Sequence, residues 1–239
     1  MTVKIVTDST ADLPPQLAKE LDITVVPVYV RFGEEVYRDR VDISEDEFYQ
    51  RLLRDHIHPG TTQPSPQDFV GVYGNLVEQA DGIISIHVSS KLSGTYNSAL
   101  LGKELVEKEC PIEVIDSQVL TKGLGQLVIA ANTIAESGKS LQQMVEEVKQ
   151  MIPSIYVHGL QDTLKYLALG GRIGKVQALL GSVLSVKPML TIKDGELVPA
   201  GRFRSRAKGI DRLFDFVKNA VDIQDVAVVY NTTPDEAHA

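Results

Sequence analysis

The sequence has few of the features that mark disulfide-rich, membrane-spanning or secreted proteins. A single cysteine, Cys110, excludes an internal disulfide and a metal site built of cysteines alone. No apolar run approaches the roughly 18 residues that would span a bilayer. The first residues lack the basic region, apolar stretch and small-residue cleavage site of a signal peptide. We therefore expect a cytoplasmic protein with no transmembrane segment.

Positive charge is also scarce. The formal net charge is −8 and there is no long basic run. This argues against a general nucleic-acid binder, because neutralisation of phosphates supplies most non-specific affinity. The basic residues are nevertheless concentrated in two stretches, which hold Arg172 and Lys175, then Arg202, Arg204, Arg206 and Lys208. Such a group is either a solvated loop or a docking patch for an acidic partner.

The first two thirds of the chain alternate short β-branched runs with longer segments of helical periodicity. The 239 residues and the 43% apolar content suffice for one large domain or two modest ones. Strands are expected at 3–7, 23–30, 83–88 and 112–116, and helices ending near 21 and at about 67–78, 96–107, 123–136 and 140–151. Ser44, with Glu47 three positions on, has the spacing of a capping box and is expected to cap a further helix. Strands that alternate with helices predict βαβ units and a largely parallel sheet, which is an α/β fold.

The pattern changes after Pro153. A strand is expected at 155–160, and it is followed by the segment 163–169, a glycine-rich stretch and an apolar helix ending near 184. A hairpin is then expected around Asp194-Gly195. A helix at 207–221 and a strand at Val226–Tyr230 complete the chain. We therefore predict two α/β domains, residues 1–152 and 153–239. A helix-start pattern that stops within a few residues predicts that the second domain is truncated.

A polar loop follows the strand expected at 83–88 and opens a helix. Ser93 is a candidate N-cap in this loop, and Gly94 and Thr95 would offer unpaired backbone N–H groups. Such a helix start favours an anion through directed donors and the helix dipole. Ligands of α/β sheets usually lie in the crevice beyond the strand ends. Because every helix needs a cap, capping alone would also explain Ser93.

A second segment has a similar form. Gly60-Thr-Thr-Gln-Pro-Ser-Pro66 precedes the helix expected at 67–78, with hydroxyls at Thr61, Thr62 and Ser65 and a proline at an initial helical position. Two hydroxyl-rich helix starts in one domain could converge on a single anion.

Two enzymatic alternatives use nearby residues. Asp8 and Asp12, four apart after the first strand, would suit a metal or an aspartyl nucleophile in a phosphotransfer protein, although such residues also make local turns and caps. His87 ends a strand near Ser93, so a Ser–His pair of a hydrolase is a further alternative.

The sequence contains no complete signature of a known enzyme class. Gly123-Leu-Gly125 continues to Val128, where a dinucleotide fingerprint needs glycine or alanine. Gly171-Arg-Ile-Gly-Lys175 is followed by Val176, where a phosphate loop needs serine or threonine. No Gly-x-Ser-x-Gly elbow surrounds a serine, and the histidines lack metal-ligand spacing. We therefore expect a binding protein with no catalytic residues, no metal and no cofactor.

Five motifs in order resemble the DegV family of bacterial fatty-acid-binding proteins over essentially the whole chain. They are Thr7-Asp-Ser-Thr-Ala-Asp-Leu-Pro14, Pro27-Val-Tyr-Val-Arg-Phe-Gly33, Thr61-Thr-Gln-Pro-Ser-Pro66, Ser89-Ser-Lys-Leu-Ser-Gly-Thr-Tyr-Asn-Ser-Ala99, and Asp162-Thr-Leu-Lys-Tyr-Leu through Gly170-Gly-Arg-Ile-Gly174.

The resemblance implies two α/β domains with one long-chain fatty acid, such as palmitate, in a buried tunnel between them. The family's carboxylate ligands correspond to Thr61 and Ser93, with Thr62, Gly94 and Thr95 beside them. Some members present their fatty acid to a separate fatty acid kinase. Arg172, Arg204 and Arg206 would then be candidates for the docking face. Lipid transport is thus the implied role.

Overall fold

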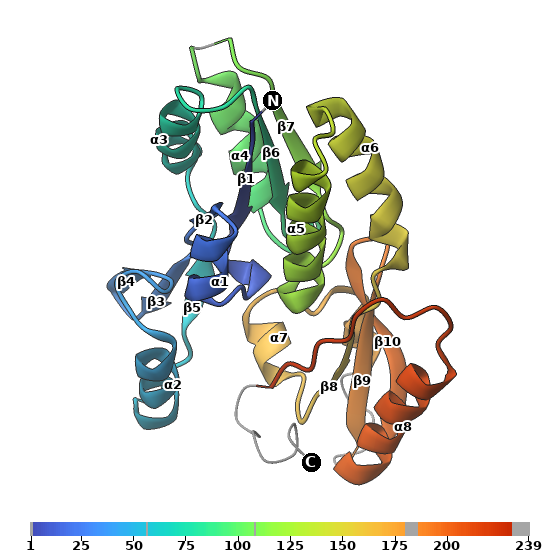
Figure 1. Ribbon diagram of the computed structural model, residues 1–239. Coiled ribbons are helices and arrows are strands. Elements are labelled where there is room, and N and C mark those ends of the chain that lie inside the picture. Colours follow the sequence, from blue (N-terminus) through green and yellow to red (C-terminus); the bar gives the residue numbers. More distant parts are fainter. Residues whose placement is uncertain (1, 56, 108, 180–185, 231–239) are drawn as a thin grey trace.

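The computed structural model describes residues 2–55, 57–107, 109–179 and 186–230 (Figure 1). Four parallel strands form the central sheet in the order β2-β1-β6-β7. Their bounds are β1 (Val3–Asp8), β2 (Ile23–Val26), β6 (Gly82–His87) and β7 (Ile112–Asp116). Parallel neighbours need crossover connections, which helices supply here. The predicted α/β fold with a largely parallel sheet is confirmed.

Helices cover both faces of this sheet. One face packs against α5 (Thr121–Glu136) and α6 (Leu141–Met151), and the other against α3 (Pro66–Leu76) and α4 (Thr95–Glu104). The short helix α1 (Pro15–Glu20) leads from β1 to β2. Successive strand residues point to opposite faces, so Ile83 joins the α3/α4 core and Ile84 the α5/α6 core. Burial on both sides explains the continuous apolar runs of these strands.

A second, antiparallel sheet in the order β4-β3-β5 was not predicted. It contains β3 (Tyr29–Phe32), β4 (Glu35–Arg38) and β5 (Gly60–Thr62). The apolar run at 23–30, expected as one strand, is divided at Pro27, which lacks the N–H that a continuing ladder would use. Helix α2 (Glu45–Arg54) packs on this sheet through Phe48, whose ring centroid lies 5.8 Å from that of Phe32. Its N-cap is Ser44, as predicted.

The strands that follow Pro153 form a third sheet in the order β10-β9-β8. Its members are β8 (His158–Leu160), β9 (Lys187–Lys193) and β10 (Glu196–Phe203). Asp194 and Gly195 both have positive φ, 52° and 80°, as a two-residue hairpin turn requires. The predicted hairpin is confirmed. The division into two domains at about residue 153 remains a prediction.

The remaining elements are helical. They are the 3-10 turns η1 (Ser9–Ala11), η2 (Ile152–Ser154) and η3 (Gly174–Leu179), and the helices α7 (Lys165–Leu169) and α8 (Arg206–Asn219). The apolar helix expected to end near 184 is a 3-10 helix as far as Leu179, and residues 180–185 lie outside the described part of the chain.

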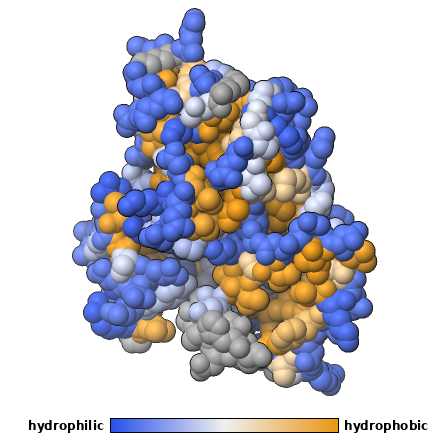
Figure 2. Space-filling model, in the orientation of Figure 1, coloured by the Kyte–Doolittle hydropathy of each residue, from blue (hydrophilic) through white to orange (hydrophobic). Residues whose placement is uncertain are grey.

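The strand predicted at Val226–Tyr230 is wrong. These residues have no regular secondary structure, and Val228 is 68% exposed. β-Branched residues favour an extended chain, but a strand also needs a neighbouring edge to pair with. Figure 2 shows apolar residues gathered on the lower right of the molecule, where this segment and α8 lie. The helix start expected after Tyr230 falls outside the described residues.

Candidate functional site

Ser93 lies in the loop between β6 and α4 (residues 88–94, the β6–α4 loop), but it is not the N-cap of α4. The N-cap is Gly94, which makes no side-chain capping bond. The Ser93 hydroxyl oxygen accepts the N–H of Thr95 at 3.3 Å and lies 2.8 Å from the Thr95 hydroxyl. The expectation of a free Thr95 N–H was therefore wrong. The bond from the Thr95 N–H to the Ser93 side chain closes a local serine turn, and the helix therefore starts one residue later than expected.

This arrangement directs the Ser93 hydroxyl. Thr95 is completely buried, and its N–H and hydroxyl can both donate to the Ser93 oxygen. When both donate, Ser93 keeps its own proton for another acceptor, and Ser93 itself is partly exposed. Among the described residues, no acceptor is found for the N–H groups of Gly94 and Tyr96. These donors at the start of a ten-residue helix suit an anion.

Thr61 and Thr62 are not at a helix start, contrary to prediction. Both lie in β5, opposite Val30 and Tyr29 of β3, and both are exposed. The helix begins later, where Ser65 forms a capping box with Asp68 and Pro66 takes the first helical position. Threonine is β-branched and suits a strand, so pairing with β3 extends the strand through Thr62.

The two predicted segments are brought together by Gln63. A methyl group added at Gly94 would lie 2.9 Å from the side-chain nitrogen of Gln63, so this amide rests against the glycine. Further along, a methyl group at Gly102 of α4 would lie 2.5 Å from Cβ of Phe69 in α3. Gln63 therefore lies beside the start of α4, and the close packing at Gly102 holds the start of α3 against the end of α4. Gln63 was missed as a site residue in the sequence, although it lies within the Thr61–Pro66 motif.

Residues after Pro153 reach the same loop. The Arg172 guanidinium donates from Nε to the Leu92 carbonyl at 3.2 Å, and the buried Ser89 hydroxyl donates to the Gly195 carbonyl at 2.7 Å. Arg172 was predicted as part of a docking face. It is exposed, but its bond to Leu92 also places a cation next to Ser93.

The other two docking candidates lie around the end of β10. Arg206 donates to Asp162 at 3.2 Å, and Lys187 pairs with the same carboxylate at 2.8 Å. The hydrogen bond from Lys187 lowers the pKa of Asp162 most, and the positive charge of Arg206 lowers it further. Arg204 is exposed.

The Ser–His pair considered for a hydrolase is not formed. His87 is completely buried; its Nδ1 lies 2.9 Å from Asp8 and its Nε2 lies 2.7 Å from Ser85. Both ring nitrogens thus have partners other than Ser93.

The two carboxylates considered for phosphotransfer are also engaged within the protein. Asp8 has no solvent exposure and accepts the N–H groups of Thr10 and Val88. Asp12 binds Arg40 at 2.9 Å and accepts the Thr121 hydroxyl at 2.6 Å. Over the described ranges, no group of three or more histidine, cysteine or acidic residues is arranged to hold a metal ion. Nor is any helix in those ranges long and apolar enough to cross a bilayer.

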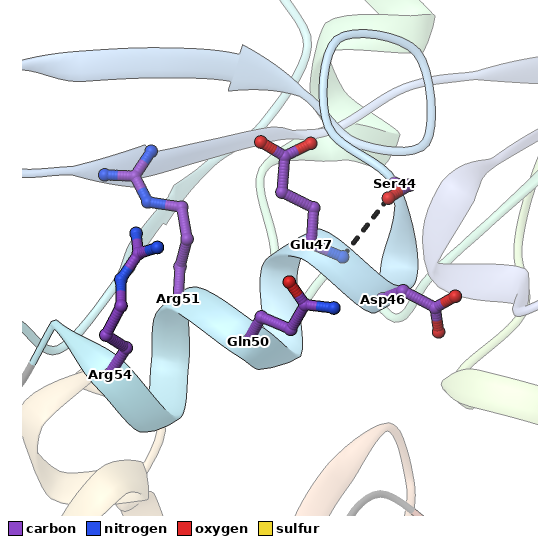
Figure 3. A pocket seen from close by; sticks show the side chains of 6 residues that line it. All are labelled: Ser44, Asp46, Glu47, Gln50, Arg51 and Arg54. Atoms are coloured by element: carbon purple, nitrogen blue, oxygen red, sulfur yellow. Dashed lines mark hydrogen bonds between the residues drawn. The ribbon is translucent and has the colours of Figure 1, made fainter.

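Two surface cavities lie away from this loop. The larger, about 380 Å³, is lined by Ser44 and by polar side chains of α2 alone, among them Arg51 and Arg54 (Figure 3). The second, about 280 Å³, is lined mainly by apolar side chains of α1, β2 and neighbouring segments, with Ser9, Lys19, Asp39 and Arg40 as polar members. Burial raises the pKa of Asp39. An exclusively polar lining does not suit an acyl chain, so the larger cavity is no candidate for a lipid tail.

The family model of DegV, which is described as a family of uncharacterised proteins, matches residues 2–239. The chain belongs to the DegV family. A DegV domain-containing protein of Caldanaerobacter subterraneus subsp. tengcongensis is 42% identical over 217 residues, which are 91% of this chain and 77% of the relative.

Solved DegV structures share the fold. A fatty-acid-binding DegV family protein from Thermus thermophilus is 38% identical with a TM-score of 0.82, over 91% of this chain and 77% of that one. A stearic acid-binding protein from Eubacterium ventriosum is 35% identical with a TM-score of 0.85, over 90% and 75% of the two chains.

Proposed function

We propose that this DegV protein binds one long-chain fatty acid and acts as a lipid carrier in the bacterial cytoplasm. The acid's carboxylate would lie at the Ser93 hydroxyl and the N–H groups of Gly94 and Tyr96, with Thr61, Thr62 and Gln63 alongside. The observation that carries this proposal is the orientation of Ser93 by the buried Thr95, at a helix start that Gln63 contacts. Fatty-acid binding by the related proteins of known structure supports it.

The head group fits the chemistry of these residues. A carboxylate cannot be buried without donors, and hydroxyl and backbone N–H groups stabilise the anion without a buried lysine. Gly94 and Thr95 contribute differently: Gly94 offers its N–H, whereas Thr95 holds Ser93 in place. Arg172 adds a positive charge at the neighbouring Leu92 carbonyl.

The acyl chain must supply most of the affinity. Burial of a methylene contributes about 0.8 kcal/mol, so a C16 chain could gain roughly 12 kcal/mol before the costs of association. Loss of rigid-body freedom removes about 4–15 kcal/mol. We propose that residues 1–152 and 153–239 form two domains and that the acyl chain lies between them. Hydrogen bonds of Ser89 and Arg172 join these two parts beside the head group.

A fatty acid kinase is the partner that we propose, as the family resemblance implies. Of the three arginines considered for its docking, Arg204 is exposed near the end of β10, whereas Arg172 and Arg206 make contacts within the protein. Arg204 is therefore the best placed to meet an acidic surface.

The proposal is tested with Ser93→Ala and Thr61→Ala. Each variant removes a hydroxyl donor, and we expect each to copurify with clearly less fatty acid than the parent chain, measured by native mass spectrometry before and after organic extraction. Ser140→Ala is the matched control, because Ser140 caps α6 with a similar hydroxyl away from this loop. Unchanged fatty-acid content in both test variants would show that the head-group site is wrong.

A further inference from the structure

A buried chain of four polar side chains lies between the parallel sheet and α3. The Tyr73 hydroxyl donates to the Ser85 hydroxyl oxygen at 2.8 Å, and Ser85 lies 2.7 Å from Nε2 of His87. Nδ1 of His87 is 2.9 Å from Oδ2 of Asp8. All four residues are 0% exposed. The series serine, histidine, aspartate is that of a hydrolase triad, but a serine with no solvent access cannot meet a substrate.

One arrangement of protons gives every donor among these four side chains an acceptor. Burial raises the pKa of Tyr73, so its hydroxyl keeps the proton that it donates to Ser85. Ser85 then donates to Nε2 of His87, and Nδ1–H of His87 donates to Asp8. A proton on Nε2 instead would give Ser85 two donors and turn the Nδ1 lone pair toward a carboxylate. No buried side-chain nitrogen or oxygen in the described part of the chain lacks a partner.

This series of hydrogen-bonded side chains ends at the β6–α4 loop. Oδ2 of Asp8 also accepts the N–H of Val88, the first residue after β6, at 3.1 Å. The next residue, Ser89, donates its N–H to the Val119 carbonyl at 3.0 Å, and its own carbonyl accepts the N–H groups of Leu92 at 2.9 Å and Ser93 at 3.1 Å. The hydrogen bond to the Ser89 carbonyl therefore fixes the position of Ser93. Ser89 directly follows Val88, whose N–H is bound by Asp8.

We infer that Asp8, oriented by His87 and Ser85, is a positioning residue for fatty-acid binding, because it fixes the start of the loop that presents Ser93. This inference rests on the proposed function. A carboxylate that accepts a backbone N–H forms a strong, charge-assisted bond. A loop held in its binding geometry loses less conformational entropy when a ligand arrives, which lowers the cost of association.

The test compares Asp8→Asn and Ser85→Ala with Thr7→Val. Asparagine has the same volume as aspartate, but its NH₂ group cannot accept a hydrogen bond. In either orientation of the amide, this NH₂ faces donors: those of Thr10, or those of Val88 and His87. The full chain is loaded with cis-parinaric acid, and release of the probe to excess albumin is followed by stopped-flow fluorescence. We expect release from Asp8→Asn to be roughly five- to tenfold faster than from the parent chain, and a smaller increase for Ser85→Ala.

Thr7→Val is the matched control. The buried Thr7 hydroxyl donates to the Ile86 carbonyl at 2.8 Å, so its loss also removes a hydrogen bond between β1 and β6. Thr7 and Asp8 are consecutive in β1 and point to opposite faces, so Thr7 is outside the buried chain. We expect Thr7→Val to lower the melting temperature without changing the release rate.

If Asp8→Asn and Ser85→Ala lower the melting temperature as Thr7→Val does but release the probe at the parental rate, the buried chain is structural only and the inference is wrong. Should Asp8→Asn fail to fold, Ser85→Ala and Tyr73→Phe decide the question. Nitrogen-15 spectra of the histidines give an independent readout: His87 should carry its proton on Nδ1, and Ser85→Ala should shift only Nε2 strongly. A parent chain that binds no probe would instead refute the proposed function itself.

Discussion

Asp55 is the C-cap of α2, where a negative charge meets the negative end of the helix dipole. Two arginines compensate for this. Arg54 contacts the carboxylate at 2.6 Å and Arg51 at 3.0 Å. Hydrogen bonds from Arg54 first and Arg51 second lower the pKa of Asp55 to about 2. Arg51 also reaches Glu35 at 2.7 Å, so this group of charges joins the end of α2 to β4.

The stability contributed by Asp55 should depend on pH in a defined direction. A pKa that is lower in the folded state contributes stability above the unfolded value of about 4, and this contribution is lost as the pH falls toward 2. We therefore expect Asp55→Asn to be less stable than the parent chain from neutral pH to about pH 5, with the difference shrinking between pH 4 and pH 2.

Urea unfolding at a series of pH values measures this difference. Arg54→Gln is the companion variant, and it should reduce the same acid-dependent part of the stability because it removes the hydrogen bond that lowers the pKa of Asp55 most. A difference between Asp55→Asn and the parent that stays constant from pH 7 to pH 2 would contradict the assignment.

The contact between α3 and α4 is the element on which the candidate site depends. Gly102 of α4 faces the first turn of α3, where an added methyl group would lie 2.5 Å from Cβ of Phe69 and 2.9 Å from the Pro66 carbonyl. Neither atom belongs to a flexible side-chain end. Close approach at this point therefore requires glycine.

Gly102→Ala should destabilise the protein by about 1–3 kcal/mol, the usual cost of overpacking. It should also reduce fatty-acid retention, because a displaced α4 would separate Gly94 from Gln63. Gly74→Ala, in α3 with no atom near the added methyl group, should instead stabilise the protein by about 0.5–1 kcal/mol. Chemical denaturation and fatty-acid content measure the two effects, and equal stabilities of the two variants would refute this account.

At the scale of elements, local sequence predicted most of the parallel sheet and its helices. The strand at Ile112–Asp116 has the predicted bounds, and Ser44 caps α2 as expected. These features depend on burial on both faces of a strand and on bonds within four residues. The β3–β5 pairing and the unpaired Val226–Tyr230 segment depend on whether a distant strand edge is available, which local pattern does not contain.

At the scale of the whole molecule, side-chain contacts join the elements after Pro153 to those before it. Ser89 binds Gly195, Arg172 binds Leu92, and the rings of His58 and Tyr166 stack with centroids 5.2 Å apart. An acyl chain held between these two parts would add apolar contacts to both. Its release would therefore weaken the whole structure and not one element alone.

Removal of bound lipid should lower the melting temperature. A ligand present at about 100 times its Kd stabilises the folded state by about 2.7 kcal/mol, which corresponds to roughly 5–10 °C for a chain of this size. Differential scanning fluorimetry before and after organic extraction measures the change, and added palmitate should restore the original value. Methyl palmitate, which lacks the carboxylate, should restore much less. An unchanged melting temperature after verified extraction would contradict the proposal.

The sequence by itself determined the α/β class, the parallel sheet, the β9–β10 hairpin and the family, because periodicity, turn residues and motif order are local properties. It also indicated Ser93 and Thr61, but Ser93 as a helix cap, which it is not, and Thr61 as part of a helix start, whereas Thr61 lies in β5. Only the tertiary structure decided that Thr95 orients Ser93, that Gln63 rests on Gly94, and that Asp8 and His87 are buried beneath the loop. The physical reason is that each of these relations depends on which segments pack together, whereas a sequence pattern specifies only the neighbours along the chain.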